Sequence, residues 1–489
     1  LSSMSADRDV NQRYNEAKKE FISIVNTYML PLFDVRGKIK CVEKASNNTE
    51  LISIEEGVKG TSVHFYPCVA NEKVRSPFYC EVGIYSSAAL KKPAIRILRE
   101  LLKTTEYEYW EPFALKRHYG KKGVRQLSYK TRTLDLAFEL GMCQWLTPTM
   151  RDAVTLHTII CRMIEWSSRT YEGKNVPFGI VVDFGKTVTT GAADYLHFLE
   201  NDSSAVFTDG IFSGIMLDKM GKIICFLTRN STPPDQRLEQ EIFVPYQFID
   251  IARHCVDEKI GIIVLTNGEI LLIKNQAVCF AKRGRKWVYF DWTRVYSKLR
   301  PYFLCDIDTT EEIIRKKIQS IYCTLLDVSF SHTGGCLSIV HPNKAKALNE
   351  EKIVADRFDL YSEGNPLEGM SSENKEKAEI LSYLLRYPEQ QLQSFFELEK
   401  PLRREILSLD GATVVSLNGS FYCAGSIVAV PGGSSAGGRT AAAKQLAKFG
   451  VGIKISEDGY IEAYGIPVNN YGALNTLATS RIVPLFKFK

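Results

Sequence analysis

The sequence has no apolar run of the length needed to cross a bilayer, so no membrane span is expected. It also lacks Cys-x-x-Cys, His-x-His and His-Glu-x-x-His motifs, although it contains 12 Cys and 7 His. Their absence argues against a zinc site or another built-in metal centre. The scattered Cys are therefore expected to be small buried side chains in a reducing cytoplasm.

A strong charge of one sign is also missing. The net charge is +6 over 489 residues, which is too weak by itself to indicate a nucleic-acid partner. Two local clusters, residues 113–134 and 282–289, mix cations with aromatic side chains. The first could contact nucleic acid or a phosphorylated ligand, and the second could face a polyphosphate. We favour an exposed loop for the first and an exposed hairpin tip for the second.

The chain is longer than one compact core, and roughly two to four domains are expected. Its composition, 45% hydrophobic and 24% charged, is ordinary for a soluble globular protein. Residues 1–4, Leu-Ser-Ser-Met, are interpreted as a cloning remnant ahead of a natural Met and not as a signal peptide. A cytoplasmic location is therefore expected.

Two regions share one order of predicted elements. In each, a helix precedes a buried strand, and an Asp-Gly pair, a hairpin, another helix and a second hairpin follow. The pair is Asp209-Gly210 in the first region and Asp410-Gly411 in the second. We interpret this as a tandem duplication, with a chance recurrence of common α/β parts as the alternative. The first region lacks a Gly-rich loop, and its Arg253-His254 pair is expected inside a helix.

These patterns predict an α/β fold class. We expect an N-terminal α+β module over residues 1–150 and two mixed-sheet domains in tandem, over residues 151–300 and 301–489. The last domain is expected to contain a charged helical insertion over residues 343–399, which could be a lid, a dimer contact or a linker.

A Gly- and Ser-rich loop, residues 431–438, leads directly into an Ala-rich helix. The first N–H groups of a helix lack intrahelical partners and lie at the positive end of the helix dipole, so they favour an anion. Arg439 adds a fixed cation with a planar donor fork. The loop therefore predicts a phosphate site, with a purely structural turn as the alternative, and nearby Asp410 could hold a metal ion or a base edge.

Residues 409–465 resemble the diadenylate cyclase (DAC) domain, which condenses two ATP molecules into cyclic di-AMP. That family has Asp-Gly-Ala before a β-hairpin, a Gly-Thr-Arg-His-Arg loop at a helix start, and a strand that ends in Val-Ser-Glu. Here Asp410-Gly411-Ala412 matches the first motif and Ile455-Ser456-Glu457 the last. Arg439 falls on the second Arg of Arg-His-Arg, whereas Gly437-Gly438 replaces the first Arg and the His.

The resemblance implies that Asp410 is the catalytic residue, which holds Mg²⁺ or Mn²⁺ and activates the attacking ribose hydroxyl. The nucleotide-binding residues that it implies, together with Asp410, are Gly411, Ala412, Ser434, Ser435, Gly437, Gly438, Arg439, Thr440, Lys444, Ser456 and Glu457. The Gly-Gly replacement removes one permanent charge and one titratable donor from the phosphate clamp. Such charges carry most of the catalysis in phosphoryl transfer, so turnover is expected to be weak, although two glycines still cradle phosphate through backbone N–H groups.

Three hypotheses follow. The first is a regulatory sensor that binds ATP or a cyclic dinucleotide without needing a cofactor. The second is an active diadenylate cyclase with Mg²⁺ or Mn²⁺, which needs a homo-oligomer to bring two ATP sites face to face. The third is a structural or partner-binding protein whose DAC-like folds are relics. The expected partners are thus an adenine nucleotide or cyclic dinucleotide and a second copy of the chain. No membrane partner is expected, and nucleic acid is a less favoured partner.

Overall fold

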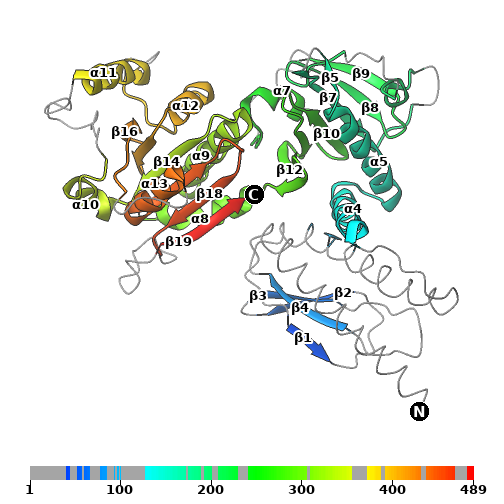
Figure 1. The fold of residues 1–489 in the computed structure, drawn as a ribbon, viewed down its shortest axis with the longest axis horizontal. Coiled ribbons are helices and arrows are strands. Elements are labelled where there is room, and N and C mark those ends of the chain that lie inside the picture. Colours follow the sequence, from blue (N-terminus) through cyan, green and yellow to red (C-terminus); the bar gives the residue numbers. More distant parts are fainter. Residues whose placement is uncertain are drawn as a thin grey trace. The chain divides into compact units, whose positions relative to one another are not determined.

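Figure 1 shows the computed structural model of the chain, coloured from the N-terminus to the C-terminus. The described residues are 40–43, 52–57, 60–65, 78–84, 93, 96, 97, 100, 127–171, 174–188, 192–200, 207–228, 241–305, 309–354, 372–386, 391–430, 437–468 and 482–489. The contacts divide the chain into two compact units. The first unit comprises residues 1–228, 254–275 and 281–289, and the second comprises residues 229–253, 276–280 and 290–489.

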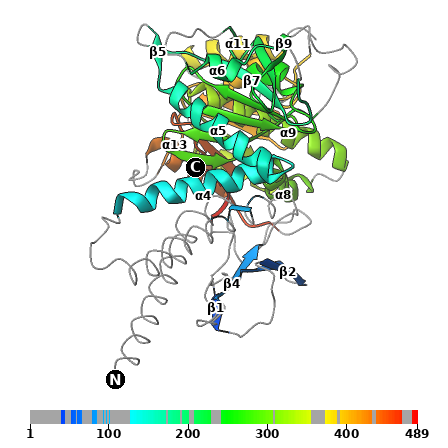
Figure 2. The ribbon, with the colours of Figure 1, turned by 90° about the vertical axis from the view of Figure 1, so that its right-hand side faces the viewer.

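The N-terminal part contains an antiparallel four-stranded sheet of strand order β1-β4-β3-β2. Its strands are β1 (Lys40–Glu43), β2 (Ile52–Gly57), β3 (Gly60–Phe65) and β4 (Phe78–Ile84). The first unit also contains two long helices, α4 (Leu127–Leu146) and α5 (Met150–Ser167), which pack against each other (Figure 2). The loop predicted for residues 113–134 is wrong for residues 127–134, because α4 begins at Leu127. The Lys and Arg residues of this part are good helix formers. Residues 113–126 lie outside the described residues.

A mixed seven-stranded sheet, of order β13-β12-β11-β10-β7-β8-β9, follows α5. Its strands are β7 (Phe178–Asp183), β8 (Ser213–Asp218), β9 (Ile223–Thr228), β10 (Lys259–Val264), β11 (Ile270–Lys274), β12 (Ala277–Arg283) and β13 (Lys286–Tyr289). Smaller elements are β5 (Thr170–Tyr171), β6 (Lys174–Asn175) and α6 (Tyr195–Phe198). The predicted hairpin at residues 282–289 is confirmed, because Gly284 and Arg285 form the exposed turn between β12 and β13.

The second unit is built on a mixed six-stranded sheet of order β16-β15-β14-β17-β18-β19. Its strands are β14 (Gly335–Val340), β15 (Ala412–Ser416), β16 (Phe421–Ser426), β17 (Gly450–Ile455), β18 (Ile461–Gly465) and β19 (Val483–Phe488). Its longer helices are α8 (Trp292–Phe303), α9 (Glu311–Ser331), α11 (Ser372–Arg386), α12 (Lys400–Leu407) and α13 (Gly438–Leu446). Its shorter helices are η4 (Tyr246–Phe248), α7 (Ile249–Ala252), η5 (Pro342–Lys344), α10 (Ala345–Glu350) and η6 (Ala447–Phe449). Two mixed sheets with flanking helices confirm the predicted α/β class.

The two mixed sheets follow the same path through five strands. A helix, α5 or α9, precedes the central strand β7 or β14, and the next strand, β8 or β15, pairs parallel to it. That strand continues into an antiparallel neighbour, β9 or β16. The chain then returns to the other side of the central strand as β10 or β17, antiparallel to it, and adds β11 or β18. The repeated order of elements in the sequence is thus a repeated sheet topology.

The two copies differ between their third and fourth strands. In the second copy this segment supplies α13, whereas in the first copy its described part supplies only η4 and α7, which belong to the second unit. The prediction that Arg253-His254 lies inside a helix is wrong, because α7 ends at Ala252 with Arg253 as its C-cap. No helix within the described residues combines the length and the apolarity that a membrane crossing requires.

Helices cover both faces of the six-stranded sheet. A Cβ atom at Gly335 in β14 would lie 2.5 Å from the carbonyl oxygen of Leu407 in α12. A Cβ atom at Gly452 in β17 would lie 1.9 Å from the carbonyl oxygen of Ala443 in α13. Gly335 pairs with Ile455, three residues from Gly452, so the two glycines point to opposite faces. The sheet is therefore the middle layer between α12 and α13.

The composition of α13 follows from this close packing. Ala443 and Ala447 are fully buried, and both contact the position where a side chain at Gly452 would lie. Small residues on the helix and no side chain on the strand let the two backbones approach closely. The start of α13 is thereby fixed at the end of the sheet where β17 ends.

This packing predicts that Gly452→Ala strongly destabilises the second unit. The added methyl group overlaps a backbone oxygen, and overpacking of this kind costs about 2–3 kcal/mol or more in the free energy of unfolding. Gly438→Ala, in the first turn of α13, is the matched control, because a Cβ atom there meets nothing within 4 Å. We expect this control to be neutral or stabilising by up to about 1 kcal/mol. Urea unfolding of both variants tests the difference, and similar midpoints for both would contradict the packing.

Candidate functional site

The topology of the six-stranded sheet brings the predicted site residues to one of its ends. β14 and β15 are parallel, so both begin at this end, and the antiparallel β17 finishes there. Asp410 and Gly411 precede β15, Glu457 follows β17, and α13 begins beside them with Gly438 and Arg439. Parts of the chain that are far apart in the sequence thus meet at one edge. Ser434 and Ser435 lie outside the described residues.

The Asp-Gly turn before β15 leaves its carboxylate exposed. Gly411 has a φ of 105°, and a Cβ atom there would lie 2.6–2.7 Å from backbone atoms of Gly425 and Ser426. Only glycine satisfies both constraints. Asp410 is exposed, and within the described part of the chain no hydrogen bond or ion pair engages its carboxylate. Asp410 is therefore available to a ligand, whereas Ala412 is fully buried as the first residue of β15.

The start of α13 consists of two glycines without a side-chain cap. Gly437 is its N-cap, with a φ of 84° and no side-chain capping bond. Cβ atoms placed at Gly437 and Gly438 would meet nothing within 4 Å. The glycines therefore do not serve close packing here. At Gly437 the backbone conformation requires glycine, and at Gly438 the missing side chain keeps space beside the first N–H groups of the helix clear of the other described residues.

Arg439 lies within a polar network beside this helix start. Its Nη1 donates to Oε1 of Glu457 at 2.8 Å. Its guanidinium lies against the turn between α9 and β14, where a Cβ atom at Gly334 would lie 2.7 Å from the same nitrogen. In that turn Nδ1 of His332 lies 2.7 Å from the carbonyl oxygen of Glu457. The network therefore orients Arg439 between the end of β17 and the start of β14.

Three of the predicted binding residues have structural contacts. Thr440 is buried in α13, and the ammonium group of Lys444, on the exposed side of that helix, lies 5.3 Å from the ring centroid of Tyr464. The Ser456 hydroxyl accepts the backbone N–H of Tyr460 at 3.1 Å and holds the turn between β17 and β18. Ser456 thus shapes the turn that presents Glu457. Within the described part of the chain, no hydrogen bond or ion pair joins Thr440 or Lys444 to Asp410 or Arg439.

Lys377 is a neighbour of the site that the sequence did not indicate. It lies on α11 within the helical insertion, and its Nζ donates to the carbonyl oxygen of Gly425 at 2.8 Å. A Cβ atom at Gly425 would lie 3.0 Å from the backbone oxygen of Asp410 and 3.3 Å from Nζ of Lys377. The insertion therefore brings a cation close to the Asp-Gly turn.

The corresponding turn in the first unit uses its carboxylate differently. Oδ1 of Asp209 accepts the backbone N–H groups of Ile211, Phe212 and Ser213 at 2.9–3.0 Å, and the Ser213 hydroxyl at 3.1 Å. Burial alone would raise the pKa of Asp209, but these hydrogen bonds outweigh it and hold the pKa below its ordinary value of 3.8. The Asp209 carboxylate therefore accepts hydrogen bonds within its own turn, whereas no described residue engages the Asp410 carboxylate.

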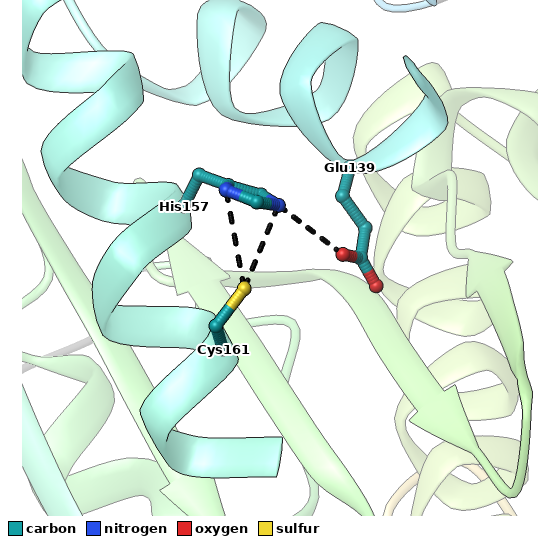
Figure 3. A group of neighbouring side chains, drawn as sticks. All are labelled: Glu139, His157 and Cys161. Atoms are coloured by element: carbon teal, nitrogen blue, oxygen red, sulfur yellow. Dashed lines mark hydrogen bonds and ion pairs between the residues drawn. The ribbon is translucent and has the colours of Figure 1, made fainter. Parts of the chain in front are cut away.

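A second group of functional side chains lies in the first unit (Figure 3). His157 and Cys161 lie one turn apart on α5, and Glu139 approaches them from α4. Nε2 of His157 lies 3.3 Å from Oε2 of Glu139 and 3.6 Å from Sγ of Cys161. Among the described residues, these three are the one group of His, Cys, Asp and Glu side chains whose ligand atoms converge as in a metal site. No sequence motif indicates these three residues, because they come from two different helices.

Comparison with protein-family models, with curated proteins and with solved structures finds no match. The interpretation of both groups of residues therefore rests on their own geometry and chemistry.

The contrast between the two Asp-Gly turns predicts that replacing the Asp side chain destabilises the protein at one turn and not at the other. Asp209→Ala leaves several N–H groups without their acceptor and should cost about 1–3 kcal/mol in the free energy of unfolding at pH 7. Asp410→Ala removes an exposed side chain that no other described residue engages, and it should change the free energy of unfolding by less than about 0.5 kcal/mol. Urea unfolding of the two variants measures the difference.

The effect of Asp209→Ala should also depend on pH. Because the folded-state pKa of Asp209 is lowered, the stability that its carboxylate contributes is present above pH 3.8 and is lost as the pH falls through the folded-state pKa. The difference between wild type and Asp209→Ala should therefore shrink in acid. Equal losses for Asp209→Ala and Asp410→Ala at pH 7 would contradict the assignment.

Proposed function

We propose that the second unit binds an adenine nucleotide, ATP or a cyclic di-adenylate, at the end of the six-stranded sheet, and that it acts as a regulatory sensor. The observation that carries this proposal is that Asp410, whose carboxylate no other described residue engages, lies at the same end of the sheet as the glycine-rich start of α13 and the cation Arg439. These are the groups that the resemblance to the DAC domain assigns to ribose or metal and to phosphate.

The helix start supports phosphate binding in two ways. Among the described residues, no side chain caps α13 and a Cβ atom at Gly438 meets nothing within 4 Å, which leaves space for a phosphate beside the first turn of the helix. Arg439, in that same turn, offers a planar donor fork. Lys377, which now donates to a backbone carbonyl oxygen, supplies a second cation next to the Asp-Gly turn.

The ion pair between Arg439 and Glu457 suits a sensor. The Arg439 side chain is 35% exposed and that of Glu457 is 69% exposed, so the pair contributes little stability, about 0–1 kcal/mol. A phosphate carries more charge and more acceptor oxygens than a carboxylate and can replace Glu457 as the partner of Arg439. The Glu457 side chain, on the turn between β17 and β18, would then be released when the ligand binds.

Binding is better supported than catalysis. Two glycines stand where the resemblance to the DAC domain calls for Arg-His, and the transferring phosphoryl group loses that charge stabilisation. The alternative is an active diadenylate cyclase, in which Asp410 and the nucleotide phosphates hold Mg²⁺ or Mn²⁺, a common arrangement for Mg²⁺. Such an enzyme also needs a second copy of the chain to supply the second ATP.

The test is thermal unfolding of the full chain with ATP or cyclic di-AMP, with and without Mg²⁺ or Mn²⁺. We expect a nucleotide to raise the melting temperature of the wild type, because a ligand that binds only the folded state stabilises it. Arg439→Ala should weaken this affinity by roughly tenfold or more, since a charge-assisted hydrogen bond to phosphate is lost.

Arg315→Ala is the matched control. Arg315 is also an exposed Arg on the second unit, paired with Glu241, and it lies 17 residues before His332 along α9, about 25 Å from the site. An equal loss of affinity in both variants, or no nucleotide effect on the wild type, would contradict the proposed site. Cyclic di-AMP made from ATP by the wild type and not by Asp410→Asn would establish the cyclase instead.

A further inference from the structure

We propose that Glu139, His157 and Cys161 form a zinc site in the first unit, with one coordination position left open. This inference concerns other residues than the nucleotide site and does not depend on it. It rests on the juxtaposition of one nitrogen, one sulfur and one carboxylate oxygen from two packed helices (Figure 3).

The distances between these atoms suit a tetrahedral ion. With Zn–N and Zn–O bonds of about 2.0–2.1 Å and a Zn–S bond of about 2.3 Å, neighbouring ligand atoms are roughly 3.3–3.6 Å apart. The nitrogen of His157 lies 3.3 Å from the oxygen of Glu139 and 3.6 Å from the sulfur of Cys161. These two distances match the spacing around a bound zinc ion, and the ligand atoms of all three residues lie within 4.8 Å of one another. Sγ of Cys161 also lies 3.9 Å from Nδ1 of His157, so rotation of these side chains must direct Nε2 and Sγ at one ion.

The backbone holds the ligands in this arrangement. His157 and Cys161 are four residues apart on α5, so their side chains lie on one face of that helix. Glu139 comes from the last half of α4, which packs on α5. Because all three residues lie on regular helices, the site needs no loop closure before it binds an ion.

The contacts of Glu139 orient its carboxylate. Oε1 accepts the indole N–H of Trp287 at 2.8 Å and the ammonium group of Lys282 at 3.0 Å, both from the hairpin β12–β13. Oε2 is thereby left toward His157. Hydrogen bonds of this kind to a ligand carboxylate are typical of metal sites and increase their affinity. A Cys thiolate and a Glu carboxylate together balance the charge of Zn²⁺.

The donor set selects the ion. A thiolate and an imidazole are poor ligands for Mg²⁺ and Ca²⁺, which prefer oxygen, and are good ligands for Zn²⁺. Binding requires neutral His157 and deprotonated Cys161, and the displaced protons pass to solvent. The Glu139 and His157 side chains are 10% and 16% exposed, so the site is partly shielded but reachable. Three protein ligands leave the fourth position to water or another small ligand.

The test is metal binding by the full chain after removal of metals with a chelator. We expect one equivalent of Zn²⁺ to bind, and Co²⁺ in its place to give the visible bands of a tetrahedral site and a thiolate-to-metal charge-transfer band. Cys161→Ser should abolish the charge-transfer band and weaken Zn²⁺ binding by at least tenfold. Glu139→Gln, which keeps an acceptor for Trp287 and Lys282, should weaken Zn²⁺ binding without loss of that band.

Cys225→Ser is the matched control, because Cys225 is a free and exposed thiol in the same unit. It should bind Zn²⁺ and Co²⁺ like the wild type. A second measurement uses the wild type alone: Zn²⁺ should slow the alkylation of Cys161, followed by peptide mass spectrometry, but not that of Cys225. The proposal is overturned if the wild type binds no Zn²⁺, if Cys161→Ser keeps the charge-transfer band, or if Zn²⁺ leaves the alkylation of Cys161 unchanged.

Discussion

The close approach of α13 to β17 at Gly452 fixes the position of the candidate nucleotide site. A helix that rests on a strand through buried Ala residues can neither slide nor tilt freely, so its first turn stays beside the end of that strand. Arg439 then has the end of β17 on one side and the turn before β14 on the other. The positions of the polar groups at this end of the sheet therefore depend on the uncharged packing contact between Gly452 and α13.

In the part of the chain that the structure describes, the first unit contains a sheet of the same topology without a contact like that of α13 with β17. Its five shared strands follow the same path, but within the described residues no helix equivalent to α13 rests on β10. Its Asp-Gly turn is also closed on itself, because Asp209 accepts hydrogen bonds from the residues that follow it. Within the described residues the Asp410 carboxylate has no such partner, so the two copies of the turn have diverged in how they use the Asp side chain.

Most of this architecture could be predicted from the sequence, because the buried strands β7, β14 and β17 are short apolar runs between clear turn residues. Two elements that were not predicted each contain proline. α8 includes Pro301 and β19 includes Pro484, and proline is normally a reason to end a helix or to reject a strand. β19 tolerates Pro484 because it is the edge strand of its sheet.

The contacts of the two sites could not be predicted, since they join residues that no local pattern connects. Lys377 meets the Asp-Gly turn from an insertion, and Glu139 meets His157 from another helix. Metal-site motifs consist of ligands at fixed short spacing in the sequence. Here the third candidate ligand, Glu139, is 18 residues from His157 and reaches it only because α4 packs on α5.

The two sites also differ in the chemistry that they can support. Asp410 offers oxygen only, and a metal ion there would need phosphate oxygens and water to complete its coordination, as Mg²⁺ commonly does. Glu139, His157 and Cys161 offer oxygen, nitrogen and sulfur from the protein itself, which favours Zn²⁺ without any nucleotide. Metal at the first site should therefore follow the nucleotide, whereas metal at the second should not. The two proposals together predict that nucleotide and zinc act independently, and that excess Mg²⁺ does not displace zinc from the cysteine site.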